Sequence, residues 1–292
     1  MSGGFAFALH GGAFGVAADH TDQNALLMRL LADGRRDLAA GASALDVCVA
    51  AVAAMEDSGL FVAGRGSGRN AAGYAECDAA VMDGATRKAG AVAGLRNVGH
   101  PVHAARLVMD HTRHVLLAGE AAVDALMPFG LVTVDDPASY FSAERSRTSF
   151  ANASSEDPPH GTVGAVACDC HGRLAAATST GGTRGKLPGR IGDTPIIGAG
   201  TYADSDVAVS CTGVGEYFMR HVAAYDVAAR VRYSGLALDD AVAAVLRGPL
   251  EEAGGRGGLI AVSRARDVAL AYNDAGMMAG STTHNAEPRL IE

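Results

Sequence analysis

A threonine stands where a polar, proline-bearing stretch ends and an apolar run begins, in the sequence His160-Gly-Thr-Val-Gly-Ala-Val-Ala. If the chain were cut before Thr162, this residue would carry a hydroxyl group and a free α-amine. The unperturbed pKa of an α-amine is about 7.7–8, which suits a base at neutral pH. Thr162 would then be nucleophile and base in one residue, and the small Gly161 would leave the scissile carbonyl open to the same hydroxyl. Most Gly-Thr pairs only begin a strand, so this alternative stays open.

A second polar group of residues follows at Thr178-Ser-Thr-Gly-Gly. On a strand, Thr178 and Thr180 point to one face, and the two glycines allow another backbone to approach closely. Three hydroxyl groups in this setting suit the wall of a polar pocket. A strand that simply ends in a turn would give the same pattern.

Two charged residues lie in a loop constrained by glycine and proline, Lys186-Leu-Pro-Gly-Arg-Ile-Gly-Asp-Thr-Pro. Arg190 could bind a carboxylate through two hydrogen bonds, and Asp193 could pair with an ammonium group. Together they could hold the zwitterionic end of an amino acid. The alternative is a surface ion pair, which contributes roughly 0–1 kcal/mol.

The segment Ser210-Cys-Thr-Gly-Val-Gly-Glu has the composition of a strand that passes through glycines into a helix. The Thr212 hydroxyl and the Gly213 amide could both donate hydrogen bonds to a developing oxyanion. One such donor is typically worth about 10²–10³ in rate. A strand–helix turn whose glycines only relieve crowding is the alternative.

These candidate residues need a scaffold, and the hydrophobic pattern predicts one with two similar halves. Each half has strands followed by helix pairs, without regular βαβ alternation, which predicts a layered sandwich with helices outside two sheets. Between the halves, residues 132–160 are polar and proline-bearing, so we interpret them as a flexible linker or processed segment. The predicted strands cover 5–10, 74–82, 90–95, 163–168, 174–178, 196–199, 207–210, 258–262 and 268–272; the predicted helices cover 24–39, 43–55, 102–111, 120–127, 216–231 and 238–253.

Composition excludes several classes of protein. With 49% hydrophobic residues and 38 glycines in 292 residues but no Gly-X-Y period, the chain is neither disordered nor collagenous. A net charge of −8 argues against a nucleic-acid partner, and no apolar run is long enough for a membrane span. The N-terminal apolar run is short for a secretory signal, and the five cysteines read as free thiols, so we expect a cytoplasmic protein. Cys168-x-Cys170 has no matching second pair, and we predict no metal-binding side chains.

Several blocks together resemble the plant-type L-asparaginase / isoaspartyl peptidase family of N-terminal-nucleophile (Ntn) hydrolases. They read LHGGA, CDAAVMDG, HGTVGAVA, AAATSTGG, KLPGRIGDTPIIGAGTYAD and SCTGVGE, and they span nearly the whole chain. The resemblance implies an α+β fold, the four-layer αββα sandwich, as a single domain over residues 1–292. It also implies self-cleavage between Gly161 and Thr162, giving an α chain of residues 1–161 and a β chain of residues 162–292, assembled as a homodimer of αβ units.

By the same resemblance, Thr162 is the nucleophile and Thr180 tunes it through a hydrogen bond. Arg190 takes the substrate α-carboxylate and Asp193 its α-ammonium group, and Thr212 and Gly213 form the oxyanion hole. The implied substrates are L-asparagine and β-aspartyl dipeptides, hydrolysed through a threonine acyl-enzyme without an organic cofactor.

This chain departs from the family pattern at one position near the nucleophile. Where the family usually has F-N-A-G-x-G, this chain has Phe61-Val-Ala-Gly-Arg-Gly, so Val62 replaces an asparagine. The change bears on the rate of processing or on substrate preference. The family also tends to bind sodium through backbone carbonyls, and the loop 55–65 has the matching length. Two other hypotheses remain, a glycosylasparaginase-type amidase and an unprocessed, non-catalytic protein that binds an amino acid.

Overall fold

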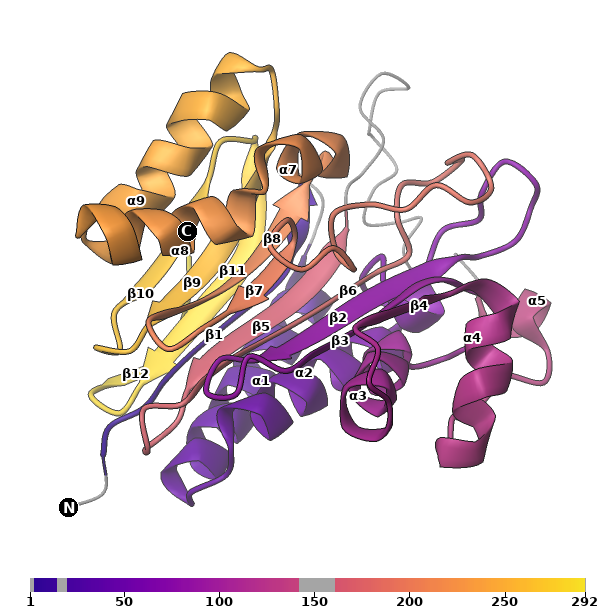
Figure 1. Cartoon of the computed structure of the whole chain (residues 1–292), viewed down its shortest axis with the longest axis horizontal. Coiled ribbons are helices and arrows are strands. Elements are labelled where there is room, and N and C mark those ends of the chain that lie inside the picture. The colour runs from indigo at the N-terminus through magenta and orange to yellow at the C-terminus, as the bar shows by residue number, and fades with distance from the viewer. Residues whose placement is uncertain (1–2, 15–19, 142–160, 292) are drawn as a thin grey trace.

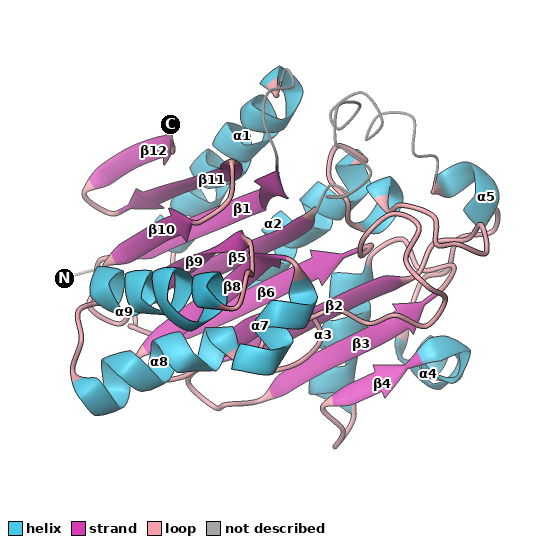
Figure 2. Cartoon of the chain, turned by 90° about the horizontal axis from the view of Figure 1, so that it is seen from above, coloured by secondary structure: helices cyan, strands magenta, loops and turns pink. Residues whose placement is uncertain are grey.

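The computed structural model describes residues 3–14, 20–141 and 161–291. Two β-sheets stack on each other and helices cover the outer face of each, which gives four layers (Figures 1 and 2). Helices α1, α2 and α3 pack on the larger sheet, and helices α8 and α9 pack on the smaller one. The predicted αββα sandwich is therefore confirmed. Within the described residues, no helix is long and apolar enough to cross a membrane.

The larger sheet has eight strands. Strands that precede residue 160 and strands that follow it lie side by side in this sheet. β1 lies between β11 and β5, so a strand from the N-terminal half pairs on both sides with strands that follow residue 160. Neighbouring strands are antiparallel except β3 and β4. The strands in spatial order are β12 (Ala286–Leu290), β11 (Gly276–Thr283), β1 (Ala6–Phe14), β5 (Thr162–Cys168), β6 (Leu174–Thr180), β2 (Cys77–Asp83), β3 (Ala89–Leu95) and β4 (Leu116–Ala118).

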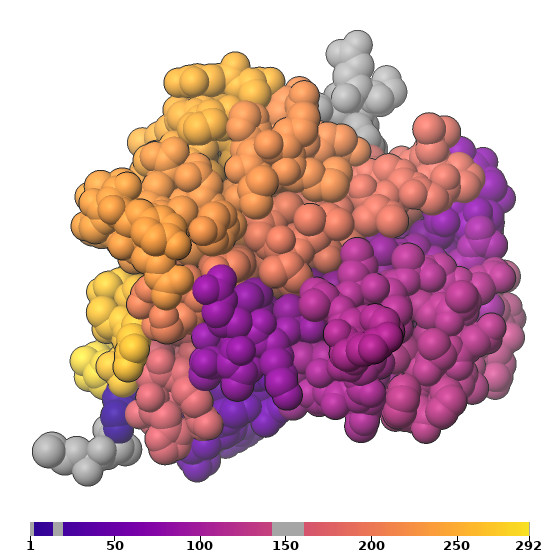
Figure 3. All heavy atoms as spheres, in the orientation of Figure 1, coloured from indigo at the N-terminus to yellow at the C-terminus, as the bar shows by residue number. Residues whose placement is uncertain are grey.

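The smaller sheet is antiparallel and comes entirely from the C-terminal half. Its strands in order are β10 (Val268–Tyr272), β9 (Gly257–Ser263), β8 (Val207–Gly213) and β7 (Thr201–Ala203). The helices are α1 (Thr21–Ala39), α2 (Ala44–Ser58), α3 (Pro101–His111), α4 (Gly119–Leu126), α5 (Pro137–Tyr140), α7 (Gly215–His221), α8 (Ala223–Ser234) and α9 (Leu238–Val245). On the surface, the N-terminal and C-terminal halves of the chain form two adjoining regions with a long boundary between them (Figure 3).

The central strands β5 and β6 are buried along their full length. Strands covered on both faces read as continuous apolar runs rather than alternating ones, and these two are rich in alanine. The sheets also approach closely: a Cβ atom on Gly164 would lie 2.0 Å from the Ser210 Oγ of β8. Glycine at this position therefore allows the two sheets to meet beneath the start of β5.

The predicted N-cap of α2 is confirmed, because the Ser43 side chain accepts a hydrogen bond from the Asp46 N–H at 3.1 Å. Other predictions were wrong. Residues 196–199 are not a strand; the short β7 follows them. The single helix predicted over 216–231 is broken at Val222, whose φ of 50° is left-handed. The helix predicted over 238–253 ends as a regular α-helix at Val245, and a kink containing Pro249 follows.

The sequence analysis also missed β4, β11 and β12. β11 reads Gly-Met-Met-Ala-Gly-Ser-Thr-Thr, without alternation of apolar and polar residues, and the short β12 carries a proline, which argues against a strand. β11 is a strand because it pairs with β1, a contact about 270 residues away in sequence that no local pattern can signal.

Candidate active site

Thr162 and Thr180 lie directly opposite each other in the larger sheet. Thr162 is the first residue of β5 and Thr180 is the last of β6, and the antiparallel register pairs them. The Thr162 hydroxyl donates a hydrogen bond of 3.2 Å to the Thr180 Oγ1, and both residues are buried. Thr180 Oγ1 also accepts the Gly182 N–H at 3.0 Å. Because Thr180 Oγ1 accepts two donors, its position beside the Thr162 hydroxyl is fixed.

Gly161 packs directly against Val62. A Cβ atom on Gly161 would lie 2.4 Å from the Val62 Cγ2 and 2.5 Å from the Val62 Cβ. Val62 is itself buried, and its carbonyl oxygen accepts the Gly181 N–H at 2.7 Å. The residue that replaces the family asparagine thus touches the peptide bond predicted to be cut.

Arg190 and Asp193 lie in the loop between β6 and β7. Arg190 donates two hydrogen bonds to the Glu216 carboxylate of α7, at 2.9 and 2.8 Å. The sequence analysis did not assign this partner, although Glu216 closes the block SCTGVGE that it quoted. This pair uses two of the five N–H groups of the Arg190 guanidinium, one on Nε and one on Nη2.

Asp193 is a buried carboxyl group whose Oδ2 has no hydrogen-bond partner among the described residues. Burial raises its pKa to about 7; its own backbone N–H and the Arg190 charge oppose that rise. An ammonium group placed against Oδ2 would supply the missing partner and favour the ionised form.

Thr212 and Gly213 end β8 beside the same end of β5. His10 of β1 pairs with Gly164, so the residues that follow His10 run toward the start of β5. There the Ala13 N–H donates a hydrogen bond of 3.3 Å to the Thr212 Oγ1. A hydroxyl oxygen that accepts this bond keeps its own proton free to donate.

Gly213 cannot easily be another residue. Its φ is 143°, and a Cβ atom there would lie 2.4 Å from the Arg256 carbonyl oxygen. The backbone at this point therefore requires glycine, and the close approach of strand β9 sets the position of the Gly213 amide.

A family model described as asparaginase matches residues 4–292. The chain belongs to this asparaginase family. It is 48% identical to the isoaspartyl peptidase of Salmonella typhimurium strain LT2, with 92% of each chain covered. It is 44% identical to the isoaspartyl peptidase of Escherichia coli K12, covering 92% of this chain and 90% of that one, and 38% identical to the isoaspartyl peptidase/L-asparaginase of Bos taurus, covering 91% and 89%.

This asparaginase-family chain also has a buried polar network that the sequence analysis missed. His10 Nε2 hydrogen-bonds to the Ser210 Oγ at 3.0 Å, and Ser210 Oγ meets the Thr178 Oγ1 at 2.8 Å. All three residues are fully buried between the sheets. Burial lowers the pKa of His10 to about 3, against a hydrogen bond with the Thr162 backbone that raises it, so the imidazole is neutral at physiological pH. The sequence feature that could have identified His10 is its place in the LHGGA block.

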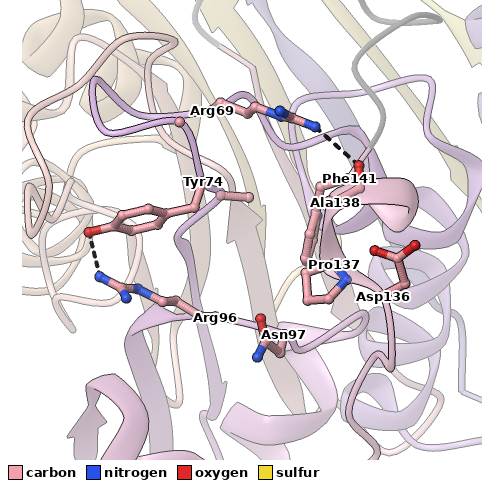
Figure 4. A pocket seen from close by; sticks show the side chains of 10 residues that line it. Arg69, Tyr74, Arg96, Asn97, Asp136, Pro137, Ala138 and Phe141 are labelled. Atoms are coloured by element: carbon pink, nitrogen blue, oxygen red, sulfur yellow. Dashed lines mark hydrogen bonds between the residues drawn. The ribbon is translucent and has the colours of Figure 1, made fainter.

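A separate pocket of about 280 Å³ lies beside the loop 69–75 (Figure 4). None of the predicted site residues lines it. Its two arginines already have partners, since Arg96 donates to the Tyr74 hydroxyl and Arg69 donates to the Ala138 carbonyl oxygen at 3.1 Å. The described residues also contain no group of three or more His, Cys, Asp or Glu side chains arranged to hold a metal ion.

Proposed function

We propose that this chain is a self-processing amidohydrolase that hydrolyses L-asparagine and β-aspartyl dipeptides. The observation that carries the proposal is the hydrogen bond of 3.2 Å between the buried residues Thr162 and Thr180. Of the linker predicted over 132–160, residues 137–140 form helix α5, and residues 142–160 lie outside the described part of the chain. Its relatives are named isoaspartyl peptidase and isoaspartyl peptidase/L-asparaginase, which supports this substrate class.

Maturation is an attack of Thr162 on its own peptide bond. The Thr162 Oγ adds to the Gly161 carbonyl carbon, the C–N bond breaks, and the nitrogen takes a proton to become the α-amine. Water then hydrolyses the ester that joins the two chains, which leaves Gly161 as a carboxylate and Thr162 with a free amine. The products are α (residues 1–161) and β (residues 162–292, hence 292 − 161 = 131 residues).

Substrate hydrolysis uses the same hydroxyl. Arg190 binds the α-carboxylate and Asp193 binds the α-ammonium group, which places the side-chain carbonyl at Thr162. The α-amine takes the hydroxyl proton as Oγ attacks, and Thr212 and Gly213 donate to the oxyanion. The amine passes the proton to the leaving ammonia or peptide amine. Water, deprotonated by the same amine, then cleaves the β-aspartyl ester to release the acid.

Thr162→Ala tests the proposal. The wild-type protein, denatured after purification, should show two masses that divide the chain between residues 161 and 162. The variant should show one intact chain and release neither ammonia from L-asparagine nor amine from β-aspartyl dipeptides. Residual self-cleavage in Thr162→Ala would refute the assigned nucleophile.

The two other hypotheses give different results in the same experiment. An unprocessed binding protein would remain intact as wild type, and would bind L-aspartate without turning over amides. A glycosylasparaginase-type amidase would be processed but would release sugar amine from glycosyl-asparagine faster than ammonia from L-asparagine.

The loop predicted over 55–65 begins only after Ser58, because residues 55–58 are the end of α2. We further propose that the segment 55–65 holds a sodium ion through backbone carbonyl oxygens. A Cβ atom on Gly66 would lie 2.0 Å from the Phe61 oxygen and 3.1 Å from the Gly59 oxygen, so these two carbonyls point into one small space. Carbonyl oxygen is the donor type that hard cations prefer. The ion would brace the loop that carries Val62. The melting temperature should rise with sodium chloride more than with choline chloride at equal ionic strength.

We also propose that the mature protein is a cytoplasmic homodimer of αβ units. Exposed apolar side chains at the edge strand β4 and around α4 support an interface there, namely Val115, Leu116, Met127, Phe129 and Val132. The five cysteines are unpaired thiols, in keeping with a reducing compartment. A native mass of about twice the single chain would agree with the dimer, and one equal to the single chain would contradict it.

A further inference from the structure

The segment that leads into β2 holds the loop of Arg190 and Asp193 at several points. The Lys186 Nζ donates to the Glu76 carbonyl oxygen at 2.9 Å. The Gly189 N–H donates to both oxygens of the Glu76 carboxylate, at 3.1 and 3.2 Å. Further along the loop, the Gly192 N–H lies close enough to the Asp78 carboxyl group to favour its ionised form. Two acidic side chains of one short segment thus anchor the substrate-binding loop.

Asp78 also shares a row with the two site threonines. The register pairs Asp78 with Thr180 and Thr180 with Thr162 across β2, β6 and β5. Residues directly opposite each other in an antiparallel sheet project to the same face. The Asp78 carboxyl group therefore lies on the face that carries the nucleophile, one strand beyond Thr180.

Asp78 is a buried polar group on which the charged residues of the loop act. The side chain is fully buried, and its Oδ1 accepts the Gly94 N–H at 2.7 Å. Its Oδ2 has no hydrogen-bond partner within the described parts of the chain. The charges of Lys186 and Arg190 both favour the carboxylate, while burial raises its pKa. Asp78 is thus close enough to Lys186, which anchors the loop, and to Arg190, which the loop presents, for both charges to favour its carboxylate.

We propose that Asp78 is a positioning residue, which together with Glu76 holds the Arg190–Asp193 loop against Thr180 and so sets the affinity for the amino-acid end of the substrate. This inference rests on the proposed function, because it assigns the loop to substrate binding. Asp78 does not contact the reacting atoms. Its loss should therefore weaken binding in the ground state and the transition state alike, and should leave self-cleavage at Thr162 intact.

The test is Asp78→Asn, which keeps the shape and the acceptor for Gly94 but removes the charge. We expect KM for L-asparagine to rise about tenfold, since hydrogen bonds to a charged group are worth more than neutral ones. Self-cleavage and kcat should stay within about twofold. The Kd for the product L-aspartate, measured by calorimetry, should rise by the same factor as KM.

The matched control is Asp83→Asn, at the other end of β2. The Asp83 carboxylate also accepts hydrogen bonds, from the Ala85 N–H at 3.1 Å and the Thr86 hydroxyl at 2.6 Å, but in an exposed turn. This control should leave KM, kcat and Kd unchanged. If Asp78→Asn does not fold, Glu76→Gln provides the second variant, because it weakens the anchor of Gly189 and should also raise KM.

The proposal is overturned if folded Asp78→Asn has the wild-type KM and Kd, or if it lowers kcat and self-cleavage together at constant KM. The second result would place the effect on Thr162 and Thr180 instead of the loop. If the proposed function itself were wrong, the wild-type protein would release no ammonia or amine. That result is distinct from an effect of Asp78→Asn, which is measured against an active wild type.

Discussion

Replacement of Gly161 by alanine tests whether packing against Val62 positions the bond that is cut. The added Cβ would lie 2.4 Å from the Val62 Cγ2, whereas ordinary contacts begin at 3.4 Å, so one residue must move by about 3.4 − 2.4 = 1.0 Å. Val62 is held in place by burial and by the 2.7 Å hydrogen bond from the Gly181 N–H. Gly161 therefore has to move, which displaces its carbonyl carbon relative to the Thr162 hydroxyl.

A displacement of about 1 Å from the reactive geometry can cost about 10²-fold in rate. This corresponds to about 2.7 kcal/mol on the activation barrier of self-cleavage. The assay is a time course of the denatured mass after purification, from which the fraction of the 131-residue chain gives the rate. We expect the Gly161→Ala precursor to persist about a hundred times longer than wild type.

Substitutions of Val62 show whether the slower cleavage of Gly161→Ala comes from the contact with Val62 or from another effect of the added methyl group. Val62→Ala removes Cγ2 but leaves its Cβ, which would still lie 2.5 Å from the new methyl group. Val62→Gly removes both atoms. In the Gly161→Ala background, cleavage should therefore return only in part with Val62→Ala and further with Val62→Gly. A wild-type cleavage rate in Gly161→Ala, or a folded double variant with Val62→Gly that stays uncleaved, would refute this reasoning.

Three further predictions concern individual groups. Thr180→Val removes the acceptor of the Thr162 hydroxyl and should lower kcat about 10²-fold in an ammonia-release assay; an unchanged kcat would exclude a role for this bond. Asp193 has its pKa raised to about 7, so KM for L-asparagine should rise as pH falls through 7, and Asp193→Asn should have a high KM that is flat with pH; a pH-independent wild-type KM would count against Asp193. Burial on α2 raises the pKa of Glu56 to about 8, so its contribution to stability is full below its ordinary value of 4.5 and is lost as pH rises through 8. The melting temperature of Glu56→Gln should therefore fall less than that of wild type between pH 7 and 9, and parallel curves would contradict this.

The layered fold could be predicted because most strands carry their own signal. The apolar runs of β5 and β8 and the glycine turns that follow β6 and β8 are local features of the sequence. β11 and β12 could not be found in this way, because they are strands by virtue of pairing with β1 and with each other. The break of the predicted helix at Val222 was equally hidden, since a β-branched residue is disfavoured in the left-handed conformation that it adopts there.

The candidate site was predictable at residues whose side chains have chemistry of their own. Thr162, Arg190 and Asp193 were assigned from side-chain type and from resemblance. Residues that act through contacts were missed: Glu216 pairs with Arg190, and His10 lies beneath the start of β5. Their roles depend on distances across the two sheets, and a pattern within one segment carries no such distances.

The interleaved sheet has a consequence for the proposed self-cleavage. The cut would fall at the first residue of β5, which pairs with β1 of the N-terminal chain on one side and with β6 of its own chain on the other. After the peptide bond breaks, both ladders still hold β5, and the Thr162 hydroxyl keeps its partner Thr180. The covalent link can therefore be lost without loss of the nucleophile's position. The same pairing would let one hydroxyl serve both proposed reactions, since β6 positions it in the uncleaved chain and would still do so after the cut.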